Sequence, residues 1–273
     1  MTKRFLTLLM LSLFITSGSA FAADIDLGEG YHVSSGFSNI LITSSDGTAI
    51  QNAVENIADG GTISLSGDFK LKNGSINIKK NLTLQGVENG RAVLDRTDAT
   101  KQDRDRVIRC EGNITLKNLT IIGGYSSNGG GIKLDKGKVK IISCDINGNT
   151  AVLGGGGIHS QAETLELVSC DISKNTSMLA GGGLSSIGGT ITMTDCNITQ
   201  NEATNLYGGG LGLAGSKITM TNCNVTNNKA EKSYGGGIAL IDSEIVTSKD
   251  CEFLGNTAST DLTADIYDSK SSN

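Results

Sequence analysis

Apolar and polar residues alternate in short runs along most of the second half of the chain. Alternation with a period of two is typical of strands with one buried face. The many β-branched and Gly residues disfavour a helical repeat in this region. The Cys lies three residues after the second residue of each pair. Because three is an odd number, both residues can face inward only if the chain bends between them. This predicts about three short strands in each unit. The alternating pairs are Val139 and Ile141, Leu165 and Leu167, Ile191 and Met193, and Ile218 and Met220.

These strands belong to a repeat of 26 to 28 residues. In each unit an apolar residue follows Gly-Gly-Gly, and a later Cys is followed after two residues by an apolar residue and after five by Asn. Strands that stack in parallel at about 4.8 Å bury their apolar faces only against neighbouring units. The sequence therefore predicts an all-β parallel β-helix of roughly seven coils. The residues after the glycines are Ile132, Ile158, Leu184, Leu211 and Ile238; the Cys column is Cys144, Cys170, Cys196, Cys223 and Cys251; the Asn column is Asn149, Asn175, Asn201, Asn228 and Asn256.

The N-terminal third fits the same architecture less regularly. Apolar residues recur with helical spacing from Ala49 to Ala58, and Gly60-Gly61 ends the pattern. A solenoid needs an atypical unit to cover its open end, so we expect a short N-terminal capping helix here. The expected organisation is a cap with irregular first coils over residues 23–117, followed by regular β-helix repeats over residues 118–273.

The first residues have the pattern of a secretory signal. Lys3 and Arg4 precede an apolar run and the small-residue site Ala20-Phe21-Ala22. This predicts a signal peptide over residues 1–22 and an exported protein, either secreted or held at the cell surface, with the periplasm as an alternative. No apolar run of about 18 residues follows, so no transmembrane helix is expected in the mature chain.

The charge of the mature chain bears on its partners. Removing the predicted signal leaves 21 basic and 28 acidic side chains, a net charge of 21 − 28 = −7. An acidic protein is a poor counterion for phosphates, so nucleic acid is not an expected partner.

The repeated Cys, Asn and Gly residues have structural interpretations. Parallel side chains in a column do not easily reach the S–S torsion near 90°, so we expect buried, unpaired thiols in preference to disulfides. No His accompanies the Cys column, and no metal site is expected. Asn tolerates the left-handed conformation of a tight bend, and stacked amides can hydrogen-bond between coils; a ligand role is the alternative. The Gly triplets allow a bend or a close backbone approach, or form a smooth stripe along which a partner lies.

Two tyrosines are candidate ligand contacts. Tyr207 and Tyr234 each precede a Gly triplet, so they should stack at its edge. Exposed stacked tyrosines can contact sugar rings or a protein, and packing within the fold is the alternative interpretation.

Evidence for catalysis is sparse. The two His residues, His32 and His159, have no evident Ser or Cys partner, so a nucleophilic triad is not supported and no cofactor is expected. A charged cluster lies in the least regular region, and it is either a solvated loop or an alternative cation-binding or catalytic site. That candidate site consists of Asp95, Asp103, Arg104, Asp105 and Arg106.

The repeats resemble those of bacterial polymorphic outer membrane proteins, which carry GGA[ILV] and FxxN. Phe253-Leu254-Gly255-Asn256 matches FxxN, and the other units have Ile or Val in place of Phe. The resemblance covers about residues 118 to 266 and implies a right-handed parallel β-helix displayed at the cell surface, often as an adhesin. The segment from Asp46 to Thr62 looks like the capping start of pectin-lyase-like β-helices, a group that includes polysaccharide lyases and hydrolases.

Two functions are consistent with these features. The leading hypothesis is an exported, non-enzymatic, adhesin-like β-helix that binds a protein or glycan on a host or neighbouring cell. The alternative is a β-helix that binds or cleaves polysaccharide. The sequence makes no prediction about the oligomeric state.

Overall fold

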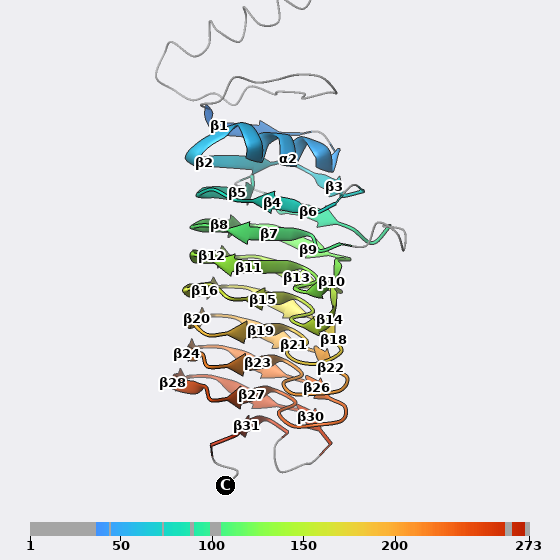
Figure 1. Cartoon of the computed structure of the whole chain (residues 1–273), viewed down its shortest axis with the longest axis vertical. Coiled ribbons are helices and arrows are strands. Elements are labelled where there is room, and N and C mark those ends of the chain that lie inside the picture. Colours follow the sequence, from blue (N-terminus) through green and yellow to red (C-terminus); the bar gives the residue numbers. More distant parts are fainter. Residues whose placement is uncertain are drawn as a thin grey trace, which may run out of the picture.

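The alternating segments form short strands that wind into a parallel β-solenoid (Figure 1). The computed structural model describes residues 37–43, 45–72, 74–87, 90–98, 105–259 and 264–270. The predicted signal peptide lies outside these residues. A regular coil runs through four parallel sheets, here named A, B, D and C in chain order.

Sheets A and B form two sides of every coil. Sheet A contains β1 (Phe37–Ile42), β2 (Ile57–Leu65), β5 (Leu82–Gly86), β8 (Ile114–Lys117), β12 (Lys138–Ile142), β16 (Thr164–Val168), β20 (Thr190–Thr194), β24 (Lys217–Thr221) and β28 (Glu244–Lys249). Sheet B contains β3 (Asp68–Lys70), β6 (Ala92–Asp95), β9 (Leu119–Ile122), β13 (Asp145–Asn147), β17 (Asp171–Ser173), β21 (Asn197–Thr199), β25 (Asn224–Thr226) and β29 (Glu252–Leu254).

Sheets D and C complete the coil. Sheet D contains β10 (Tyr125–Asn128), β14 (Thr150–Gly154), β18 (Thr176–Ser177), β22 (Glu202–Ala203), β26 (Lys229–Ala230) and β30 (Thr257–Ala258). Sheet C contains β4 (Ile76–Ile78), β7 (Ile108–Glu111), β11 (Ile132–Lys136), β15 (Ile158–Ser160), β19 (Leu184–Ile187), β23 (Leu211–Ala214), β27 (Ile238–Ile241) and β31 (Ile266–Asp268).

The predicted parallel stacking is confirmed, with two differences in detail. Equivalent residues of successive coils are paired, as in Ile132 with Ile158 and Ile146 with Ile172. The described residues form about eight coils where roughly seven were predicted, because Asp68–Lys70, with one apolar residue, gave no alternation by which to recognise β3. A regular coil also has four strands in place of about three, because the strands of sheet D are short and mostly polar.

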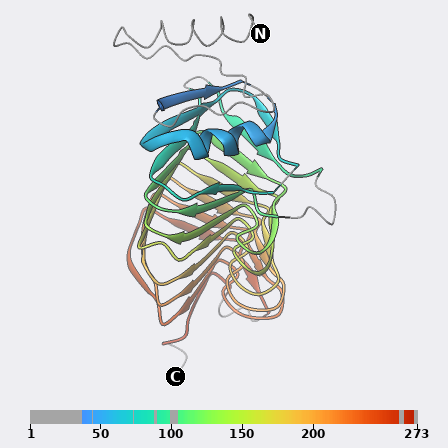
Figure 2. The same cartoon turned by 45° about the horizontal axis from the view of Figure 1, so that its top comes forward.

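One helix, α2 (Gly47–Asn56), lies across the N-terminal end of the coils (Figure 2). It begins after Asp46, whose carboxylate accepts a hydrogen bond from the Thr48 N–H at 2.9 Å, a typical N-cap. Gln51 accepts one from the backbone of Asn77 at 2.8 Å, so the helix takes the place of a strand beside β4. It ends two residues earlier than its apolar pattern predicted, because Ile57 is already extended and buried as the first residue of β2.

The Cys column lies inside the coils. All six cysteines have free thiols; Cys110 and four of the ladder cysteines are buried, and Cys251 is half-buried because it lies in the last coil. Burial raises the pKa of Cys144 to about 11. A thiol that stays protonated is a poor nucleophile, so Cys144 contributes packing rather than chemistry.

The Asn column forms a buried ladder of side-chain amides. The Asn175 amide and backbone N–H both donate to Oδ1 of Asn201, at 3.1 and 3.0 Å, and the pattern repeats from coil to coil. The left-handed backbone conformation lies one residue earlier than we expected, for example at Lys174, where φ is 54°. The Asn side chains therefore stabilise the bend by hydrogen bonds between coils. The residue before each Asn adopts the left-handed backbone conformation.

The Gly triplets are packed between coils and form no surface stripe. The first Gly has the left-handed conformation, with φ of 74° at Gly208. At the second, a Cβ atom on Gly209 would lie 2.5 Å from the Gly236 carbonyl oxygen and 2.5 Å from the Lys229 nitrogen. Because all three residues of this triplet are buried, the interpretation as a smooth binding stripe is wrong.

Candidate functional site: a groove along sheet C

The outer face of sheet C changes character along the solenoid. Its strands alternate inward and outward side chains, so two outward columns run from coil to coil. Both are charged or polar near the N-terminal end and apolar near the C-terminal end. The first column contains Arg109, Lys133, His159, Ser185, Gly212, Ala239 and Tyr267; the second contains Asp135, Gln161, Ile187, Ala214 and Ile241.

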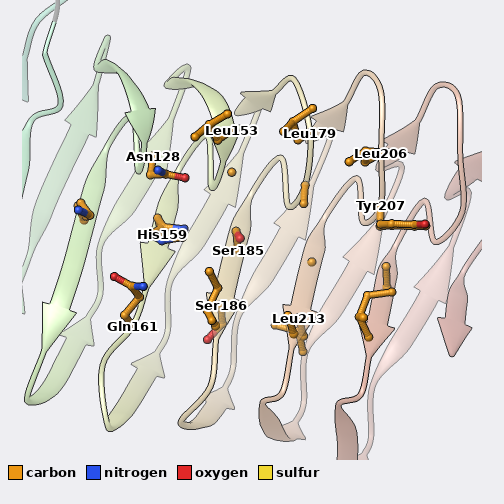
Figure 3. Close-up of a pocket in the computed structure, with 18 residues that line it drawn as sticks. Asn128, Leu153, His159, Gln161, Leu179, Ser185, Ser186, Leu206, Tyr207 and Leu213 are labelled. Carbon is orange, nitrogen blue, oxygen red and sulfur yellow. The ribbon is translucent and has the colours of Figure 1, made fainter. Parts of the chain in front are cut away.

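A ridge of leucines runs beside these columns. Leu153 is in β14 of sheet D, and Leu179 and Leu206 follow the sheet D strands β18 and β22; all three hold equivalent positions in successive coils, each two residues before a left-handed Gly (Figure 3). Leu153 and Leu206 are 46% and 40% exposed. Together with the outer face of sheet C the ridge encloses a groove of about 470 Å³, a size typical of ligand sites. The sequence interpretation missed this groove, because it assigned no element to the segment between the Asn of one unit and the next Gly triplet.

The charged end of the groove is an ion-paired cluster. Asp135 accepts from Nζ of Lys133 at 2.8 Å and from Nε of Arg109 at 2.6 Å. Arg109 also contacts Glu111 at 3.2 Å. Burial opposes ionisation of Asp135, but the hydrogen bonds from the two cations lower its pKa. The Asp135 carboxylate is therefore ionised at neutral pH and holds no proton to donate as a general acid.

His159 lines the groove in a buried position. Its side chain is 4% exposed, and Nδ1 has no hydrogen-bond partner. Burial, assisted by the positive charge of Lys133, lowers the pKa of His159 to about 4. The imidazole is therefore neutral at pH 7, and its buried Nδ1 is left without a hydrogen-bond partner.

The two predicted tyrosines stack, and a third joins them. The ring centroids of Tyr207 and Tyr234 lie 6.3 Å apart, and Tyr267 lies 5.9 and 4.8 Å from them. Tyr207 lines the groove on its C-terminal side (Figure 3). The third ring comes from β31 and precedes no Gly triplet, so the repeat gave no signal for it.

The predicted charged cluster is only partly described. Asp95 lies on sheet B, where it accepts from Nζ of Lys70 at 2.6 Å. Arg106 lies just before β7 and donates to the Ser126 hydroxyl at 2.6 Å. In the described part of the chain no ion pair or hydrogen bond joins Asp95 to Asp105 or Arg106. Asp103 and Arg104 lie outside the described residues, so the complete cluster stays a prediction.

Two further features concern metals and membranes. Within the described ranges, no group of three or more His, Cys, Asp or Glu side chains is placed to hold a metal ion. No helix among those same residues is long and apolar enough to cross a membrane.

Comparison with protein families assigns most of the solenoid. A family model described as a right-handed β-helix region matches residues 107–272, more than half of the chain. This match and the strand stacking confirm the predicted right-handed parallel β-helix. No curated protein and no solved structure matches the chain.

Proposed function

Since the chain belongs to the right-handed β-helix family, we propose that it is an exported, non-enzymatic protein that binds the surface of a host or neighbouring cell through the groove on sheet C. The observation that carries this proposal is the alignment of exposed apolar side chains along the groove. Contiguous exposed apolar surface on a soluble protein marks interaction sites. Leu153, Ile187 and Leu206 are 46%, 52% and 40% exposed on the rigid stack of coils.

The ionisable groups in and beside the groove favour binding over catalysis. General acids and bases work best with pKa values near the working pH. Here the cations around Asp135 lower its pKa, and burial lowers the pKa of His159 to about 4. Neither group is tuned to exchange protons at neutral pH.

Two features of the sequence support location at a surface. Residues 1–22 have the pattern of a signal peptide. The GGG-apolar and FxxN-like repeats resemble polymorphic outer membrane proteins, whose β-helices often act as adhesins. These two patterns support export and adhesion.

Cell binding tests the proposal. We expect the purified protein to bind cells, and Leu179→Ser to weaken that binding about tenfold by removing apolar contact. Met178→Ser is the matched control, because Met178 is the preceding residue, is 45% exposed and does not line the groove. Equal binding by Leu179→Ser and the control would contradict the proposed surface.

A second candidate function is the binding or cleavage of polysaccharide. The paired charges of Arg109, Asp135 and Lys133 at one end of the groove and the stacked tyrosines at the other favour it as a sugar-binding surface. In incubations with acidic polysaccharides we expect no release of unsaturated or reducing ends. Release that Asp105→Asn or Arg106→Gln abolishes would place the enzymatic function first.

A further inference from the structure

The groove on sheet C is amphipathic along its length. Lys133 is the single charged residue among the described residues that line it, and it lies at the N-terminal end with Asn128 and Gln161. The unpartnered Nδ1 of His159 lies in the adjacent coil. Beyond these residues the lining is mostly apolar as far as Ala239 and Ile241. A ligand that fills the groove therefore needs one polar end and an apolar body.

The charges around His159 favour an anion at the polar end. The charged side chains that act on His159 are Lys133, Arg106 and Asp135, two cations and one carboxylate. Asp135 is already shared between Lys133 and Arg109. A carboxylate placed beside Lys133 and His159 would gain a cation and a hydrogen-bond donor without displacing a buried pair.

The backbone around the groove excludes strand addition. The strands of sheet C from β11 to β27 are paired on both sides. The backbone of the leucine ridge is also hydrogen-bonded between coils. The Ala180 N–H donates to the Leu153 carbonyl oxygen at 3.1 Å, and the Gly181 N–H donates to the Tyr207 carbonyl oxygen at 3.1 Å. An extended peptide would find no free edge, and its own backbone groups would lie unpaired against leucines. An alkyl chain has no such groups to satisfy.

We propose that the groove binds a long-chain fatty acid, with its carboxylate at Lys133 and His159 and its alkyl chain along Leu153, Leu179 and Ile187 toward Tyr207. This inference rests on the proposed function, because it assigns the ligand of the same binding surface. Four coil steps separate Lys133 from Ala239 in the paired register, a distance of about 19 Å at the strand spacing. The groove is therefore long enough to hold one extended alkyl chain.

Calorimetric titration with octanoate, laurate and dodecanol, each below its aggregation limit, tests the ligand. We expect laurate to bind more tightly than octanoate, by up to about fourfold for each added CH₂ group. Dodecanol should bind more weakly than laurate, because it lacks the charge that Lys133 recognises. Failure of the folded protein to bind laurate would overturn the inference.

Matched variants locate the site. Leu179→Ser should weaken laurate binding about tenfold, while Met178→Ser leaves it unchanged. Lys133→Gln should reduce the affinity for laurate to that for dodecanol, while Lys140→Gln, on the outer face of sheet A, has no effect. Ala214→Phe, which fills the groove, should abolish binding without loss of the thermal transition. Unchanged laurate affinity in all three groove variants would place any bound ligand elsewhere and overturn the inference.

The outcomes separate this inference from the proposed function. Cell binding that depends on Leu179, without laurate binding, overturns the fatty acid and retains the groove as a docking surface. If protease treatment of the cells then abolishes attachment, the occupant is a protein. Laurate binding that Leu179→Ser weakens, without attachment to cells, supports the ligand assignment and overturns the proposed function.

Discussion

Gly209→Ser is expected to destabilise the β-helix by about 3 kcal/mol, because there is no room for a side chain between the coils. A Cβ atom at this position would lie 2.5 Å from the Gly236 carbonyl oxygen and from two backbone atoms of Lys229. Relief requires the two coils to separate, which would weaken the hydrogen bond from Gly209 N–H to Gly235 oxygen, now 3.0 Å. Thermal or urea-induced unfolding measures the effect.

Thr219→Ser provides the control for this variant. Thr219 lies ten residues later, on β24. Its half-buried side chain is on the outer face of sheet A. Its replacement removes one methyl group and should change the free energy of unfolding by less than about 0.5 kcal/mol. A Gly209→Ser protein that unfolds together with this control would show that the close packing of the triplet is unnecessary for the fold.

Asn201→Ala should also cost about 3 kcal/mol, because it leaves several buried polar groups without partners. Oδ1 of Asn201 accepts from both the backbone and the side chain of Asn175, at 3.0 and 3.1 Å. Its Nδ2 donates to the carbonyl oxygen of Ile172 at 2.8 Å and to Oδ1 of Asn228 at 3.0 Å. Alanine removes all of these contacts from a site that water does not reach.

The matched control is Asn197→Ala, four residues earlier on β21. Asn197 is exposed, and its side chain accepts one hydrogen bond, from Asn224 at 2.9 Å. Water can replace that bond, so a loss of less than about 1 kcal/mol is expected. Equal unfolding free energies for the two variants would mean that the amide ladder does not stabilise the coils.

The repeat made the coils predictable. The position of each buried Cys and Asn followed from its phase relative to the Gly triplet, because stacking forces equivalent residues into one column. The phase of the repeat did not predict which residue of each bend has the left-handed backbone conformation. Asn175 is the residue that the ladder requires, but the left-handed conformation belongs to Lys174. Sequence alone favours Asn for that conformation, and the hydrogen bonds of the ladder assign Asn a different role.

The groove was not predicted because its residues follow no single pattern of burial. Leu153, Leu179 and Leu206 share one position relative to the left-handed Gly, and that spacing is the signal that could have indicated a ridge. Nothing in one coil shows that its outer leucine faces His159 or Ile187. That relation arises only when the segment after sheet D folds beside sheet C.

Hydroxyl-radical footprinting of the protein bound to cells tests most directly whether the groove is the binding surface. If it is, side-chain oxidation of Leu153, Ile187, Leu206 and Tyr207 slows on binding. Val246 and Leu254 are exposed apolar side chains on sheets A and B of the last coil, 52% and 61% accessible, and should be oxidised as before. Protection of Val246 and Leu254, with unchanged oxidation along the leucine ridge, would contradict the groove as the binding surface.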